Sequence, residues 1–117
     1  LDAITLETLR LGTPFFLPRV VPEEGVEIEG NFIPGGTIVA VAAYSQQISE
    51  ANFHPNPQDF IPERWLQSNH GESTGIRRSA LGSFSFGPYA CVAKRFAMQE
   101  VRHVLARLIL TFDMEFV

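Results

Sequence analysis

The stretch from residue 54 to residue 88 constrains this chain most, because it shows almost no hydrophobic periodicity. Proline and glycine interrupt it repeatedly, at Pro62, Gly71, Gly75, Gly82 and Gly87. An unstructured segment of this length is uncommon in a compact domain unless it is functional or disordered. We therefore expect something to hold it in place, and a large bound cofactor is one candidate.

Regular elements are predicted on both sides of this stretch. Apolar residues at helical spacing predict helices over residues 3–11 and 91–110, and a shorter helix over residues 45–51. Four short β-prone segments predict a small, largely antiparallel sheet: residues 19–21, 26–28, 31–33 and 37–42. Alternation over residues 112–116 predicts a terminal strand. The predicted fold class is α+β, with an N-terminal helix, a small antiparallel sheet, a long irregular loop, a long helix and a terminal strand.

Length and charge exclude several broad classes. The 117 residues have the length of one ordinary domain, and the net charge of −4 gives no general attraction to nucleic acid or anionic lipid. A single cysteine excludes an internal disulfide framework. The longest apolar run, residues 38–44, is too short to span a bilayer, which takes about 20 residues. Because the chain begins with Leu1 inside a helical pattern, we expect it to be a piece of something longer.

That single cysteine, Cys91, follows a loop rich in glycine and proline and opens the long predicted helix. The unpaired N–H groups of a first helical turn stabilise an anion such as a thiolate. No second cysteine and no nearby histidine completes a zinc site, which needs four ligands. A single protein thiolate suits haem, because the porphyrin supplies the equatorial ligands. The alternative is a small buried hydrophobic side chain, the commoner role of a lone cysteine.

Three motifs carry a family resemblance. Phe84-x-x-Gly87-x-x-x-Cys91 resembles the cysteine-ligand loop of the cytochrome P-450 family of haem-thiolate monooxygenases. The segment from Glu7 to Arg10 resembles the family's E-x-x-R helix motif, and Pro62-Glu-Arg-Trp65 resembles its P-E-R-[FW] motif. The motifs occur in the family's order. The resemblance covers essentially the whole chain and implies that residues 1–117 are the C-terminal, haem-ligand-bearing part of a single, mainly helical domain.

The resemblance implies two groups of site residues. Glu7, Arg10 and Arg64 are expected to form a buried charged cluster beneath the haem, because a guanidinium can bind a carboxylate in bidentate fashion. They are scaffold, and no catalytic residue is expected within this segment beyond the iron ligand. The second group is expected to hold the cofactor, with Cys91 as the axial ligand of the haem iron: Phe84, Gly87, Tyr89, Arg19 and Ala93.

Several of these positions leave alternatives open or depart from the family. Arg19 matches a propionate-binding arginine, but a solvated arginine at a strand start is nearly as common. Tyr89 stands where the family usually has Arg or His, and Ala93 replaces a usual Gly. Gln47-Ile48 replaces a common His-Arg pair, which is expected to remove local polar contacts. An apolar triplet is expected either to contact substrate or to pack in the core: Phe15, Phe16 and Leu17.

The function implied is insertion of one oxygen atom from O₂ into a small lipophilic substrate, with haem as cofactor. NADPH would act only indirectly, through a partner reductase that meets positive charge at Lys94, Arg95 and Arg102, unless these residues are simply a solvated helix face. The alternatives are a haem-thiolate isomerase or dehydratase acting on peroxides, or a truncated non-catalytic chain. No nucleic-acid partner is expected. A membrane anchor would lie in the missing N-terminal region, and a eukaryotic member would reside at the endoplasmic reticulum membrane.

Overall fold

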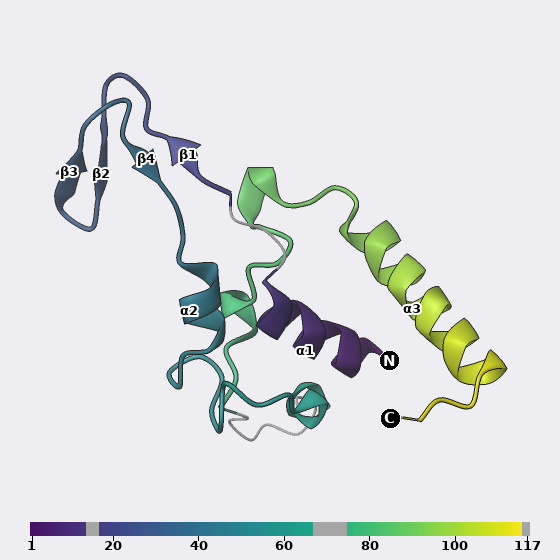
Figure 1. The fold of residues 1–117 in the computed structure, drawn as a ribbon. Coiled ribbons are helices and arrows are strands. Elements are labelled where there is room, and N and C mark those ends of the chain that lie inside the picture. Colours follow the sequence, from purple (N-terminus) through teal and green to yellow (C-terminus); the bar gives the residue numbers. More distant parts are fainter. Residues whose placement is uncertain (14–16, 67–74, 116–117) are drawn as a thin grey trace.

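The computed structural model describes residues 1–13, 17–66 and 75–115 (Figure 1). Three α-helices are present in this part: α1 (Asp2–Gly12), α2 (Ala43–Gln47) and α3 (Lys94–Thr111). Three short 3₁₀ turns lie between α2 and α3: η1 (Pro62–Trp65), η2 (Arg78–Ala80) and η3 (Gly87–Tyr89). Outside residues 67–74, the region predicted as irregular therefore contains single turns and no long element.

The strands form two separate two-stranded ladders. The outer ladder pairs β2 (Val26–Ile28) with β3 (Asn31–Ile33) around a turn at Gly30, and the inner ladder pairs β1 (Arg19–Val20) with β4 (Ile38–Val39). Both are antiparallel, as predicted, but they do not form one continuous sheet. Pro22 and Pro34 fall between the ladders, and proline has no N–H to donate to a ladder.

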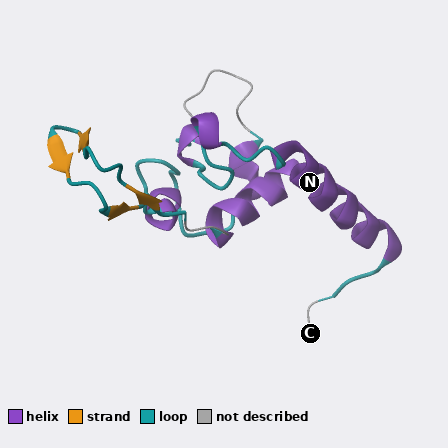
Figure 2. Ribbon diagram, turned by 90° about the horizontal axis from the view of Figure 1, so that it is seen from above, coloured by secondary structure: helices purple, strands orange, loops and turns teal. Residues whose placement is uncertain are grey.

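A small core lies between α1 and η1. Ala3, Phe53 and Trp65 are its buried apolar residues, and the Phe53 and Trp65 ring centroids are 6.0 Å apart. The molecule extends 57 × 31 × 30 Å with a radius of gyration of 17.7 Å, against about 13 Å for a compact domain of this length. Figures 1 and 2 show the ladders and α3 projecting from opposite sides of this core.

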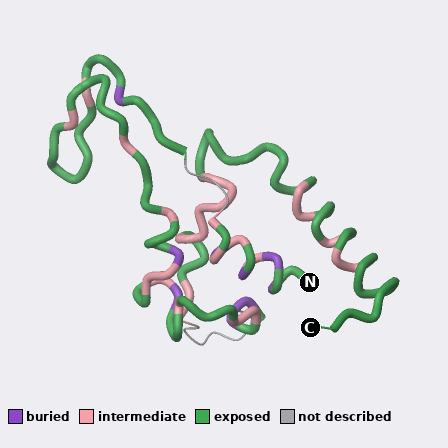
Figure 3. The backbone as a smooth tube through the Cα atoms, viewed as in Figure 1, coloured by how far each residue is buried: buried purple, intermediate pink, exposed green. Residues whose placement is uncertain are grey.

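Helix α3 is amphipathic but has no buried residue (Figure 3). It contacts α1 through an ion pair in which Arg102 Nη2 donates to Asp2 Oδ2 at 2.8 Å. Val104 and Ile109, on its apolar stripe, remain about half exposed, at 49% and 55%. No helix in the described ranges is both long and apolar enough to cross a membrane.

The predicted bounds of two helices and one predicted strand were wrong. α2 runs from Ala43 to Gln47 instead of over residues 45–51, and α3 begins at Lys94 instead of residue 91. Residues 112–115 form no strand, although they alternate. A strand needs a neighbour to bond with, and within the described residues these four have none. Phe116 lies outside the described residues.

Phe53 tests whether this small core holds the fold. Replacing Phe53, whose side chain is 0% exposed, by alanine should lower the free energy of unfolding by about 3–5 kcal/mol, because a cavity is left beside Trp65. Phe60→Ala is the matched control, since Phe60 is 52% exposed and should lose well under half as much. Urea unfolding followed by Trp65 fluorescence gives both values, and equal losses would contradict this account of the core.

Candidate functional site

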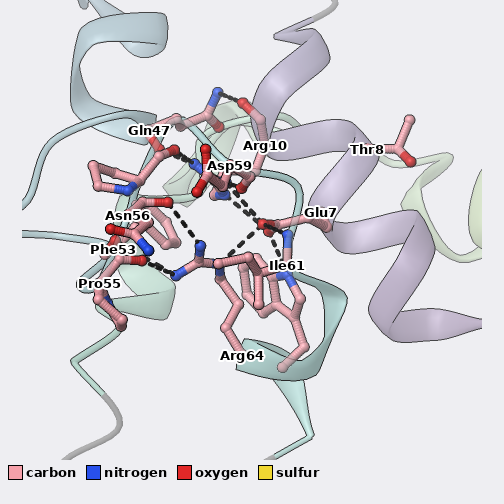
Figure 4. Close-up of polar contacts among 12 residues, drawn as sticks. Glu7, Thr8, Arg10, Gln47, Phe53, Pro55, Asn56, Asp59, Ile61 and Arg64 are labelled. Atoms are coloured by element: carbon pink, nitrogen blue, oxygen red, sulfur yellow. Dashed lines mark hydrogen bonds and ion pairs between the residues drawn. The ribbon is translucent and has the colours of Figure 1, made fainter.

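The Glu7 carboxylate, fully buried on α1, gathers five N–H donors (Figure 4). Arg10 Nε and Nη2 bind its two oxygens in bidentate fashion, each at 2.8 Å. Arg64 Nε donates at 2.9 Å, Trp65 Nε1 at 2.8 Å, and the Ile61 backbone N–H at 2.9 Å. Spacing of three residues places Glu7 and Arg10 on one face of α1, and η1 brings the other partners to that face. We call Glu7, Arg10, Arg64 and Trp65 the Glu7 cluster.

The two guanidinium groups use their remaining donors to hold the start of the irregular stretch. Arg10 donates to the carbonyls of Gln47 (2.6 Å), Pro57 and Asp59 (3.0 Å). Arg64 donates to three further backbone carbonyls at 3.2–3.5 Å: those of Phe53, Pro55 and Asn56. The chain itself therefore holds residues 53–59, and this part of the stretch needs no cofactor to order it.

Electrostatics of the Glu7 cluster favour the ionised carboxylate. Burial raises the pKa of Glu7, but the donors from Arg10, Ile61, Trp65 and Arg64 outweigh burial and lower that pKa from 4.5 to about 2. Within the described residues, no buried side-chain nitrogen or oxygen lacks a hydrogen-bond partner. Removing one member of the Glu7 cluster would therefore lower the free energy of unfolding strongly, because its partners would stay buried without a hydrogen-bond partner.

Gln47 is the residue that sequence reasoning missed. Its position was expected to remove local polar contacts, yet its side chain is 0% exposed and its amide donates to Arg10 O at 2.9 Å and Thr13 Oγ1 at 2.7 Å. Its side-chain oxygen also accepts from Ser83 Oγ at 3.3 Å. A glutamine in a short helix is usually a surface residue, so no sequence signal separated Gln47 from its neighbour Gln46.

Cys91 lies in a loop that closes on itself through the backbone; we call residues 84–91 the cysteine loop. The Cys91 N–H donates to Phe84 O at 2.8 Å, and η3 fills the space between them. Gly87 has φ of 60°, in the left-handed region that favours glycine, and a Cβ there would meet nothing within 4 Å. The thiol of Cys91 is free and exposed.

The prediction that Cys91 opens the long helix was wrong. α3 starts three residues after Cys91, and Ala93 is its N-cap residue. The carbonyl of Cys91 accepts the Lys94 N–H at 3.2 Å, so the residue is tied to the helix by its backbone. Residues 92 and 93 form a turn between Cys91 and the helix.

Arg19 contacts Tyr89, which precedes Cys91 by two residues in the cysteine loop. The Arg19 guanidinium carbon lies 5.5 Å from the centroid of the Tyr89 ring, a cation–π distance. Both line a cavity of about 230 Å³ whose wall includes Leu17 and Phe86. Phe84 is covered by Lys94, whose Nζ lies 5.7 Å from the ring centroid. Phe15 and Phe16 lie outside the described residues.

The donor set fits haem better than a bare metal ion. Across residues 1–13, 17–66 and 75–115, no three His, Cys, Asp or Glu side chains converge on one point. Haem needs only one cysteine ligand from the protein, and Cys91 is free and exposed. Arg19 and Tyr89 offer N–H and O–H donors of the kind that hold carboxylates. The described residues therefore fit an axial ligand with a carboxylate-binding pair nearby.

Comparison with known proteins assigns the family. All 117 residues match the cytochrome P-450 family, and the chain belongs to it. It is 48% identical over 100 residues to the cytochrome P-450 monooxygenase oryQ of Aspergillus oryzae, covering 85% of this chain and 58% of that protein. It is 41% identical to the monooxygenase stcF of Emericella nidulans and 43% identical to BipB of Cochliobolus sativus, each across 98% of this chain. These matches cover 24% and 22% of those two proteins. The family consists of oxidoreductases whose cofactor is haem.

The low pKa of Glu7 predicts an acid-dependent loss of stability. Because the folded-state pKa lies below the ordinary value, the stabilisation is complete above pH 4.5 and is lost as the pH falls from 4.5 towards about 2. The shift corresponds to about 3 kcal/mol. Urea unfolding across this pH window should show the loss.

Two substitutions test whether Glu7 is the source of this acid-dependent loss of stability. Glu7→Gln should flatten the acid-dependent loss and cost about 3–5 kcal/mol at neutral pH, because two buried guanidinium groups lose their carboxylate. Glu63→Gln is the matched control, since Glu63 lies in η1 but is exposed. A pH profile unchanged by Glu7→Gln would contradict the assignment.

Proposed function

We propose that residues 1–117 form the haem-ligand-bearing, C-terminal part of a cytochrome P-450 domain, with Cys91 as the axial ligand of the haem iron. The observation that carries this proposal is the position of the thiol. Cys91 is exposed in a loop closed by its own N–H bond to Phe84. The Glu7 cluster holds residues 53–59, which precede the cysteine loop in the sequence. Family membership supports the same ligand, because the chain keeps the cysteine-loop motif.

The exposed apolar surface supports a larger parent domain. The chain exposes 9072 Å², whereas a compact protein of 13.0 kDa exposes about 6,300 Å². Much of the excess lies on α3, which buries no residue, and on the ladders. In the proposed domain, other segments cover these faces.

The proposed reaction inserts one atom of O₂ into a C–H bond of a small lipophilic substrate. Two electrons and two protons convert the other oxygen atom to water, and a reductase that oxidises NADPH supplies the electrons. When bound, haem supplies the oxygen-activating chemistry, which an axial thiolate favours. The relatives named above are all monooxygenases, which favours this reaction over peroxide rearrangement or dehydration.

This chain's residues have three tasks in that reaction. Cys91 would ligate the haem iron, and Arg19 and Tyr89 would bind the haem carboxylates. Leu17, beside this pair, offers apolar contact to the substrate. Lys94 and Arg95 at the start of α3 offer positive charge to a reductase, whereas Arg102 is already paired with Asp2.

The ligand assignment is tested by the spectrum of the reduced CO complex. A longer form carrying the region before Leu1 should show the red-shifted Soret band of thiolate ligation, and Cys91→Ser should abolish it. The 117-residue chain alone should bind haem weakly or not at all, because one side of the cofactor would face water. If Cys91→Ser keeps the band in the longer form, Cys91 is not the ligand.

Haem retention tests the carboxylate-binding pair. In that longer form, Arg19→Leu should speed haem loss by roughly tenfold or more, since a charged hydrogen bond contributes about 1.5–3 kcal/mol. Transfer of haem to an apo-globin acceptor gives the rate. Arg95→Leu, which removes an exposed arginine away from the cavity, should leave the rate unchanged. Equal rates of haem loss for the two variants would contradict a role of Arg19 in binding haem.

A further inference from the structure

The carboxyl end of α1 is bonded by two segments from elsewhere in the chain. The last four carbonyls of a helix have no partner within it. Here the Ser83 hydroxyl donates to Leu9 O at 3.0 Å, and the Gln47 side-chain amide donates to Arg10 O at 2.9 Å. One donor comes from the end of α2, and the other from the residue that immediately precedes the cysteine loop.

Gln47 and Ser83 are also bonded to each other. The Gln47 side-chain oxygen lies 3.3 Å from Ser83 Oγ, so the hydroxyl proton is shared between this oxygen and Leu9 O. The Gln47 side-chain amide also donates to Thr13 Oγ1 at 2.7 Å. The backbone carbonyl of Gln47 accepts from Arg10 Nη1 at 2.6 Å. This fully buried side chain therefore joins α1, α2 and the segment before the cysteine loop.

Capping alone does not account for these bonds. Thr13 already ends α1, because its N–H donates to Leu9 O at 3.3 Å and its hydroxyl donates to Arg10 O at 3.2 Å. The two carbonyls that Gln47 and Ser83 bind are thus satisfied without them. What Gln47 and Ser83 add is a connection between the Glu7 cluster and the cysteine loop.

We propose that Gln47 and Ser83 form a clamp that positions the cysteine loop, and hence the thiol of Cys91, against the Glu7 cluster. Arg10 binds Gln47, Gln47 binds Ser83, and Ser83 is covalently followed by Phe84, whose carbonyl accepts the Cys91 N–H. Both members of the clamp are positioning residues, because they act on the iron ligand through the loop. The effect on the iron ligand rests on the proposed function. The clamp itself rests only on hydrogen bonds within this chain.

Hydrogen exchange measures the clamp without haem. Gln47→Ala and Ser83→Ala should each raise amide exchange in residues 84–91 by roughly tenfold, because the loop opens without α1 unfolding. Gln46→Ala and Ser79→Ala are the controls, since both side chains are exposed, and they should leave this exchange unchanged. Ser83→Thr keeps the hydroxyl and should restore the low exchange. The double variant should open the loop little more than either single variant, because the two residues act as one unit.

The spectrum of the reduced CO complex measures the consequence at the ligand. In the longer haem-binding form, both alanine variants should convert part of the thiolate-type Soret band into the band of a protein without thiolate ligation, and Ser83→Thr should retain it. If wild-type protein never shows the thiolate band, the proposed function fails, while the exchange experiment still decides the clamp. Unchanged loop exchange in Ser83→Ala, or equal effects from Gln46→Ala and Gln47→Ala, would overturn the clamp. Should Gln47→Ala fail to fold, Ser83→Ala carries the test, because it removes only one hydroxyl.

Discussion

The ionised carboxylate of Glu7 is the group on which the rest of the structure depends. Five N–H donors from α1, η1 and the residue before η1 converge on its two oxygens. Burying such a group is unfavourable unless every oxygen is bonded, and here the bonds are sufficient to keep its pKa near 2. The carboxylate in turn fixes the orientation of two guanidinium groups. The positions of those groups decide where the backbone that follows can lie.

The two arginines replace secondary structure as the source of order in residues 53–59. Buried carbonyls normally bond within helices or ladders, and a chain with neither must find donors elsewhere. Arg10 and Arg64 provide them from planar groups with several N–H donors each. An irregular path is therefore stable here because side chains supply its hydrogen bonds. Lysine could not replace either arginine, since its three donors lie on one nitrogen, whereas Arg10 makes five bonds and Arg64 makes four.

Sequence patterns predicted the elements better than their connections. Helical spacing identified α1, and β-prone segments identified β2 and β3, because these signals are local. The partnership of Glu7 with Arg64, 57 residues later, came from a family resemblance, because no periodicity links such distant residues. The start of α3 was misplaced because the apolar stripe continues through Val92, which precedes the helix. Gln46 and Gln47 are chemically identical neighbours, so only the tertiary fold decides which one is buried.

The hydrogen bonds that hold this chain change from charge-assisted at the Glu7 cluster to neutral near the thiol. At Glu7 all five bonds go to a charged carboxylate and four of them are buried. The clamp at Gln47 and Ser83 uses neutral bonds, and the cysteine loop closes through a backbone bond beside an exposed thiol. A ligand that must meet a large planar cofactor has to stay exposed until the cofactor arrives, so it cannot be fixed by burial. Its position has to be fixed by the backbone segments on which it lies. A buried charge cluster is suited to that task, because leaving any one of its members unpaired is so costly that its geometry varies little.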